Sequence, residues 1–292
     1  MTSDFGLAMD DRKTNYIETN DGVHIHYAEA GRGAPLLLVP GFSQSAEEFS
    51  KQVDDLSRDY RVIAVDHRGH GRSEKPDHGY RISRLAADLR DLIQALDLQD
   101  VTILAHSLGC AVIWSYWDLF DGERIGRLVL VDQGPVPAAD LVAPEQAAEL
   151  GAVFSADMAF GIAAGLRGAD ALSTSESIVD MMHTPELSAD DRAWLVEQNL
   201  LLPRQHAATL HLDHYGNDWR DVLPRISVPT LVIGGAASFF DARVAQWVAA
   251  QIPGARYRVF SAAEGGSHLM FWENPTLFNA VVREFLRSVV EK

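Results

Sequence analysis

The chain has 292 residues, of which 47% are hydrophobic and 23% charged, and it carries a formal net charge of −16 at pH 7. This length and composition are those of a globular protein with a large core, so a wholly disordered or fibrous chain is excluded. The negative charge argues against nucleic acid or an anionic membrane surface as a partner. Residues 1–13 lack the apolar core of a signal peptide, and no segment approaches the ~20 apolar residues of a membrane span, so we expect a cytoplasmic protein.

The N-terminal half begins with a predicted hairpin and continues as alternating strands and helices. Two β-rich runs, Asn15–Glu18 and Val23–Tyr27, flank Asp21-Gly22, a pair typical of a tight turn. Short, uninterrupted apolar runs follow, with helical patterns such as Ile82–Leu96 between them. These runs are Leu36–Val39, Val62–Val65, Val101–Leu104 and Leu128–Val131. Apolar strands that alternate with helices indicate a parallel sheet buried on both faces.

The strand pattern disappears between residues 134 and 223, where the sequence is helical or loop-like and rich in Ala, Leu and Met. Strand runs resume at Thr230–Ile233 and Tyr257–Phe260, and a helical pattern over Pro275–Val290 closes the chain. An insertion of helices between two strands of a parallel sheet can lie above the strand ends. Residues 134–223 are therefore expected to form a cap over one edge of the sheet.

The strongest chemical signal is Ala105-His106-Ser107-Leu108-Gly109, which follows the strand Val101–Leu104 and precedes the helical run Cys110–Phe120. A serine on a sharp strand-to-helix turn presents its hydroxyl above the sheet, with the helix N-terminus beneath it. Small residues are needed on either side because the turn brings the strand and helix backbones together. This setting favours a nucleophile over an ordinary serine N-cap.

With this motif the chain resembles the α/β-hydrolase family, and the resemblance extends over nearly its whole length. Three further features match: Pro40-Gly41-Phe42 after the third strand, Asp66–Ser73 after the fourth, and Gly266-Ser267-His268 after the last. The resemblance implies an α/β-hydrolase fold, with a mostly parallel central sheet flanked by helices. It also implies a core domain of residues 1–133 and 224–292, with residues 134–223 inserted after the sixth strand as a helical cap.

Within the family, three segments look most like the esterase and cofactor-free chloroperoxidase branch: Ser107–Cys110, Val131–Gln133 and Gly265–Phe271. That likeness implies a serine hydrolase for an apolar carboxylic ester or lactone, working without metal or cofactor. Perhydrolysis, in which peroxide replaces water on the acyl-enzyme, and carbon–carbon bond hydrolysis use the same residues. A slowly turning-over small-molecule receptor on the same fold is the alternative from a different class. The sequence assigns no oligomeric state.

The resemblance also assigns roles to single residues. Ser107 is expected to attack an acyl carbonyl, while His268, in a Gly-rich loop after Arg256–Phe260, takes its proton as general base. The backbone N–H groups of Phe42 and Leu108 are expected to form the oxyanion hole. His268 then activates water, which releases the acid from the acyl-enzyme.

Three positions depart from the family pattern. Ala105 stands where the first glycine of the serine turn is usual, and alanine is still small. Pro40 replaces a common histidine, which leaves the N–H of Phe42 in place. The third departure concerns the catalytic acid, which the family usually places just after the seventh strand, where this chain has Ser238.

Two carboxylates can replace the missing acid. Asp132 directly follows the run Leu128–Val131, one strand spacing (~4.8 Å) from the usual acid strand, and its other interpretation is a cap of the following turn. Asp241 lies three residues beyond Ser238, and its other interpretation is a helix N-cap before Ala242–Ala249. We favour Asp132, because haloalkane dehalogenases and certain lactone hydrolases of the family place their acid after this strand.

Other residues carry weaker signals. The loop Asp66–His70 is expected to be structural, and neither it nor the insertion predicts a metal site. Four residues of the insertion are expected to form a polar cap surface: His206, His211, Asp213 and His214. Candidates for an apolar acyl or aromatic pocket are Phe154, Met158, Met181, Met182, Trp194 and Trp272, although apolar side chains at such spacing more often simply hold a cap together.

Overall fold

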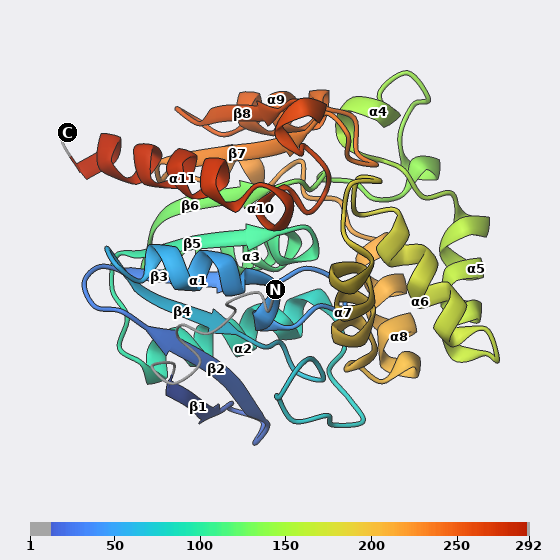
Figure 1. The fold of residues 1–292 in the computed structure, drawn as a ribbon, viewed down its shortest axis with the longest axis horizontal. Coiled ribbons are helices and arrows are strands. Elements are labelled where there is room, and N and C mark those ends of the chain that lie inside the picture. The colour runs from blue at the N-terminus through green and yellow to red at the C-terminus, as the bar shows by residue number, and fades with distance from the viewer. Residues whose placement is uncertain (1–12, 291–292) are drawn as a thin grey trace, which may run out of the picture.

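The computed structural model describes residues 13–290, so residues 1–12, compared above with a signal peptide, lie outside it. Its centre is an eight-stranded sheet in the order β1-β2-β4-β3-β5-β6-β7-β8 (Figure 1). The strands are β1 (Lys13–Glu18), β2 (His24–Ala30), β3 (Pro35–Val39), β4 (Arg61–Val65), β5 (Val101–His106), β6 (Ile125–Val131), β7 (Thr230–Gly235) and β8 (Arg256–Phe260). Only β2 pairs antiparallel to its neighbours β1 and β4, and every other pair is parallel. The predicted hairpin and the mostly parallel sheet are confirmed.

Helices cover both faces of the sheet because its central strands are apolar on both faces. Leu37 and Ile63 point into the core beneath α2 (Ile82–Ala95), α3 (Leu108–Phe120) and α9 (Arg243–Gln251). Leu36 and Leu38 point to the opposite core, under α1 (Ser50–Leu56), α10 (Met270–Glu273) and α11 (Pro275–Val290). Figure 1 shows α1, α10 and α11 in front of the sheet and α2 and α3 behind it. The short 3-10 helices are Ala46–Phe49, Ala139–Leu141, Leu223–Arg225 and Ala262–Glu264.

The insertion between β6 and β7 is helical, as predicted. Its helices are α4 (Ala147–Leu150), α5 (Ala156–Arg167), α6 (Ala171–Asp180), α7 (Ala189–Leu200) and α8 (Arg204–Tyr215). Helices α5 to α8 lie beyond the carboxyl ends of the parallel strands, at the right of Figure 1. Asp213 joins this group to the core by accepting a hydrogen bond from the first N–H of α2, that of Ile82, at 2.7 Å. The division into two domains at the expected boundaries stays a prediction.

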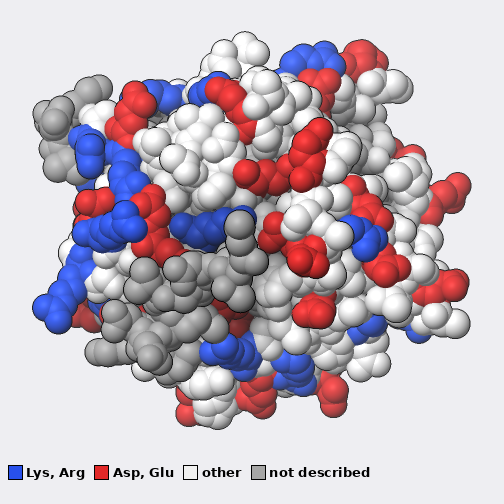
Figure 2. All heavy atoms as spheres, viewed as in Figure 1, with Lys and Arg blue, Asp and Glu red and all other residues white. Residues whose placement is uncertain are grey.

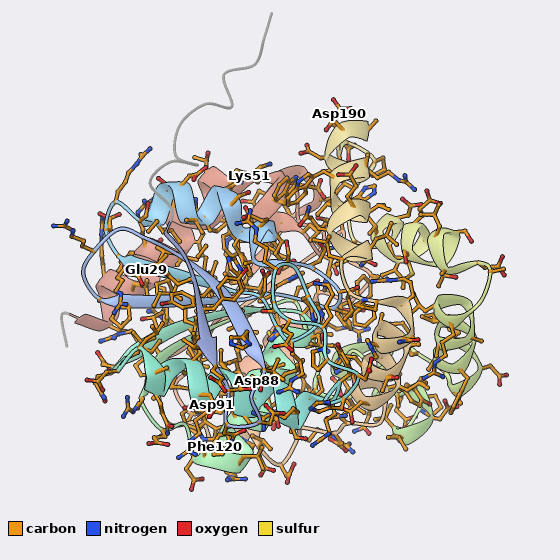
Figure 3. All side chains as sticks on the ribbon, turned by 90° about the horizontal axis from the view of Figure 1, so that it is seen from below. Glu29, Lys51, Asp88, Asp91, Phe120 and Asp190 are labelled. Carbon is orange, nitrogen blue, oxygen red and sulfur yellow. The ribbon has the colours of Figure 1, made fainter. Side chains whose placement is uncertain are left out.

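Serines cap the first turns of two helices of the insertion. The hydroxyls of Ser155 and Ser188 accept hydrogen bonds from the first turns of α5 and α7. Asp190, in the first turn of α7, lies at the outer end of that helix (Figure 3), where a negative charge complements the helix dipole.

Acidic side chains are scattered over the face shown in Figure 2, and basic ones gather mainly at its left side. Several arginines are bound to carboxylates, as Arg283 of α11 is to Asp55 and Asp59. No helix within residues 13–290 is both long and apolar enough to cross a membrane.

Candidate active site

Ser107 stands on the turn between β5 and α3 with φ 50° and ψ −125°, a strained conformation for a residue other than glycine. The strained turn at Ser107 leads directly into α3, which packs closely on the sheet. A Cβ at Gly109, in the first turn of α3, would lie 2.6 Å from the carbonyl oxygen of Val39 on β3. Only glycine allows the helix to start this close to the strand, and the turn leaves the Ser107 side chain facing a cavity.

The imidazole of His268 is hydrogen-bonded to Asp132, with Nδ1 2.6 Å from Oδ2. Asp132 ends β6 with φ 51°, and its N–H donates to the carbonyl of Ile233 on β7 at 2.8 Å. Its carboxylate also accepts the hydroxyl of Ser238 and, at 3.2 Å, the N–H of Gly235. A carboxylate can only accept hydrogen bonds, so Nδ1 of His268 is the donor. The lone pair of the neutral ring therefore lies on Nε2.

Asp241, the rival carboxylate, contacts a different partner. It accepts hydrogen bonds from the backbone N–H of Arg243 at 2.9 Å and from its guanidinium at 3.0 Å and 2.9 Å, and these bonds lower the pKa of Asp241. The structure therefore places Asp132, and not Asp241, against His268. Position 238, where the family acid is usual, supplies a hydroxyl to that same Asp132. The catalytic role of Asp132 stays a prediction.

The environment of His268 favours a neutral ring. Its centroid lies 4.5 Å from the ring of His106 and 4.5 Å from that of Phe239, and its side chain is 1% exposed. Burial lowers the pKa of His268 to about 4, His106 adds to the shift, and the bond to Asp132 opposes it. At neutral pH the ring is thus an uncharged imidazole that can accept a proton at Nε2.

Ser107 and His268 line the same cavity, but within residues 13–290 the serine hydroxyl forms no hydrogen bond with the imidazole. Catalytic hydrogen bonds commonly tighten only when a substrate is bound. The N–H of Leu108 is the first of α3 and has no acceptor in the helix. The N–H of Phe42 likewise has no acceptor among the described residues. Two free amide donors therefore border the cavity at the expected positions.

A buried glutamate and histidine support both parts of this site. Glu48 Oε1 accepts the N–H of Gly41, next to Phe42, at 3.0 Å, and lies 3.3 Å from Nδ1 of His106. Nε2 of His106 is 3.1 Å from the carbonyl oxygen of His268, to which it can only donate. Both side chains are fully buried. Glu48 and His106 thus connect the loop of Phe42 to the loop of His268.

The helical insertion is hydrogen-bonded to the loop that carries His268. The N–H of Leu269 donates to the carbonyl of Met182 at 3.1 Å. The carboxylate of Glu273 accepts the N–H of Thr184 at 2.9 Å and also the hydroxyls of Thr184 and Ser267. These bonds fix the segment between α6 and α7 to the histidine loop.

The cavity above Ser107 is small and mostly apolar. Its volume is about 70 Å³, several times the ~10–15 Å³ that one water needs. Its apolar wall is formed by Phe42, Leu108, Phe154, Ile162, Ile178, Met181, Met182, Phe239 and Phe240. Of the predicted pocket residues, Phe154, Met181 and Met182 therefore do line it.

The other three predicted pocket residues do not line the cavity. Met158 of α5 is 50% exposed. Trp194 of α7 and Trp272 of α10 stack on each other, with centroids 4.7 Å apart. Helical spacing could not show which of the six candidates turn toward Ser107, and these three do not.

The polar cap surface was also a wrong expectation. His206 is buried against Tyr80, with stacked rings 4.0 Å apart, and Asp213 caps α2. His211 and His214 are buried and line the cavity. Among residues 13–290 no group of three or more His, Cys, Asp or Glu side chains is placed to hold a metal ion. Sequence reasoning also missed Glu48, because nothing near it in the chain indicates contact with the turn of Ser107.

The fold described above is the α/β-hydrolase fold, and a family model described as "alpha/beta hydrolase fold" matches residues 34–275. A protein of Synechocystis sp., provisionally named a non-heme chloroperoxidase, is 30% identical over 92% of this chain and 97% of its own. A non-heme haloperoxidase of Rhodococcus erythropolis is 28% identical over 94% of this chain and 99% of its own. An esterase structure from Rhodococcus sp. matches with a TM-score of 0.80 at 25% identity, over 94% of this chain and 98% of that one.

These matches identify the class of protein as a hydrolase enzyme. The chain belongs to the α/β-hydrolase family, and its relatives lie in the esterase and chloroperoxidase-like branch that the sequence motifs indicated.

Proposed function

We propose that the protein hydrolyses carboxylic esters or lactones through an acyl-enzyme on Ser107. The observation that carries this proposal is the 2.6 Å hydrogen bond between His268 Nδ1 and Asp132, in a cavity that Ser107 and His268 both line. The bond leaves Nε2 of His268 as an uncharged base on the side of the cavity. In this proposal residues 134–223 act as the cap that closes the cavity over Ser107.

The reaction begins when the Ser107 hydroxyl oxygen attacks the carbonyl carbon and its proton passes to Nε2 of His268. The carbonyl oxygen becomes an oxyanion and accepts hydrogen bonds from the N–H groups of Phe42 and Leu108. His268 then gives the proton to the departing alkoxide, and the acyl-enzyme remains. A water molecule loses a proton to the same nitrogen and attacks the acyl carbon, the bond from that carbon to the Ser107 oxygen breaks, and His268 returns the proton to the serine as the acid leaves. Asp132 stabilises the imidazolium that forms at each transfer.

The cavity favours small substrates. Its volume of about 70 Å³ and its apolar wall suit a short acyl group rather than a long chain. A large leaving group would have to extend out of the cavity.

Perhydrolysis is the second candidate, and the names of the non-heme chloroperoxidase and haloperoxidase relatives favour it. In that reaction hydrogen peroxide takes the place of water, and the acyl-enzyme yields a peracid. The same serine, histidine and oxyanion donors serve both acceptors, so only the second half of the cycle differs.

The test is a stopped-flow assay with p-nitrophenyl acetate, with Ser107→Ala as the matched control. We expect a burst of one p-nitrophenolate per enzyme followed by steady turnover, both absent in the variant. A burst without turnover would contradict the hydrolase proposal and favour a slow receptor, and equal rates in the two proteins would exclude Ser107 as the nucleophile. Adding hydrogen peroxide and measuring peracid against acetate then decides between the two acyl acceptors.

A further inference from the structure

Two histidines inside the cavity take no part in the proposed acyl transfer. His211 and His214 lie three residues apart on α8, so they share one face of the helix, and both line the cavity. Their exposed fractions are only 7% and 8%. The remaining polar side chain of the wall, apart from Ser107 and His268, is Gln133, whose amide nitrogen already donates to the carbonyl of Gly134 at 2.8 Å.

Each of these imidazoles has a ring nitrogen without a partner. Within residues 13–290, neither Nε2 of His211 nor Nδ1 of His214 forms a hydrogen bond. Buried polar atoms in folded proteins almost always have a partner, so an apolar wall that retains two such atoms calls for an explanation. Both nitrogens are closed to water in the free protein, so a substrate group reaches them when the side chains of the wall turn toward it.

The charge state of the pair limits the kind of ligand. Burial lowers the pKa of His211 to about 4 and that of His214 to about 3, so both rings are neutral at pH 7. A neutral imidazole offers one donor and one acceptor. Such a pair matches a hydroxyl or a carbonyl. A carboxylate does not fit, because desolvating an ion against neutral groups is costly.

The pair also lies close to the proposed reaction centre. The ring of His211 is 5.9 Å from the ring of Phe42 and 5.6 Å from that of Phe154, measured between centroids. Phe42 carries one of the two amides proposed for the oxyanion hole. His211 therefore packs against the side chain of a residue whose amide is proposed for the oxyanion hole.

We propose that His211 and His214 recognise a hydroxyl or carbonyl group on the acyl chain of the substrate, near the scissile carbonyl. The inference rests on the proposed function and narrows its substrate class to hydroxyacyl or oxoacyl esters and lactones. The hydrogen bonds select these over acyl groups of the same shape that lack the polar group.

The first test compares p-nitrophenyl 3-hydroxybutanoate with p-nitrophenyl 3-methylbutanoate, which differ by a hydroxyl and a methyl of similar size. We expect a ratio of kcat/KM of at least about tenfold in favour of the hydroxyacyl ester. His211→Phe and His214→Phe should each lower that ratio about tenfold or to unity. His211→Gln and His214→Asn, which put an amide near the unpartnered nitrogens, should retain most of it.

The control variant is His206→Phe on the same helix, because His206 stacks on Tyr80 and does not line the cavity. Its ratio should equal that of the wild type. A wild-type ratio near one would overturn the inference, as would Phe variants that lose both esters by the same factor.

A second measurement is independent of turnover. Histidine ring nitrogens of the Ser107→Ala variant are followed by ¹⁵N NMR during titration with methyl 3-hydroxybutanoate or methyl 3-methylbutanoate. We expect the His211 and His214 resonances to shift with the hydroxylated ester only. If those shifts occur while the wild type hydrolyses no ester, the proposed function fails and the recognition pair stands. If esters are hydrolysed but neither resonance responds, the recognition pair is wrong.

Discussion

The most decisive prediction concerns Asp132→Asn. In the wild type, Oδ1 of Asp132 accepts the N–H of Gly235 while Oδ2 accepts Nδ1–H of His268. An asparagine must keep its oxygen toward Gly235, because its amide group would otherwise meet that N–H donor to donor. Its nitrogen then faces Nδ1 of His268, which has to give up its proton, and the proton moves to Nε2. The ring is left with no lone pair for the proton of Ser107.

Loss of the correct tautomer lowers kcat by about 10³- to 10⁴-fold in triads of this kind, which corresponds to about 4–5.5 kcal/mol of activation free energy. The assay is steady-state hydrolysis of p-nitrophenyl acetate, with urea unfolding to confirm that the variant folds. Asp241→Asn is the matched control and should change kcat less than twofold, because within residues 13–290 the Asp241 carboxylate bonds to Arg243 and not to His268. The reasoning is refuted if folded Asp132→Asn keeps a tenth of the activity, or if Asp241→Asn loses as much.

Three further predictions follow from burial and close packing. Because the pKa of His268 is lowered to about 4, kcat/KM should rise with pH through about 4 and stay level from pH 5 to 8, and an acid limb near pH 6.5 would contradict that. Histidines that are buried and neutral in the folded protein become protonated below pH 6.5 only in the unfolded chain. The free energy of unfolding should therefore fall toward pH 4, by up to ~1.4 kcal/mol per pH unit for each such histidine. Urea titrations at pH 7, 6 and 5 measure this, and a flat profile would show that those rings are hydrated. The histidines concerned are His67, His70, His211, His214 and His268. Gly109→Ala should lower Tm, because the new Cβ would lie 2.6 Å from a backbone oxygen. Gly161→Ala in α5 has open space around it and should raise the free energy of unfolding by ~0.5–1 kcal/mol. Equal Tm values for the two variants would refute the packing argument.

Much of the fold was predictable because its signals are local. Runs such as Leu36–Val39 are buried on both faces, and continuous hydrophobicity bounded by turn residues is what such strands require. The helix over Pro275–Val290 begins and ends at the predicted residues. The turn of Ser107 was equally readable, since Gly109 and the flanking strand and helix are adjacent in sequence.

The cap and the acid were less readable because they depend on contacts between distant residues. Residues 132 and 268 are far apart in the chain, so the sequence could name Asp132 and Asp241 as candidates but could not measure which one reaches the imidazole. Periodicity alone likewise could not show that Met158 is exposed or that His211 is buried and lines the cavity. Ser238 gave a usable hint, because a hydroxyl at the usual acid position suggests that the carboxylate comes from elsewhere.

The hydrogen bonds between the cap and the histidine loop have a consequence for how substrate range can evolve. The carbonyl of Met182 accepts the backbone N–H of Leu269, next to His268, so a substitution that shifts the backbone at Met182 also shifts the base. Phe154 and Ile162 line the cavity from segments that none of these bonds holds. A lineage, or a directed-evolution library, should therefore gain new specificities through substitutions at Phe154 and Ile162, while changes at Met182 are removed by selection for activity.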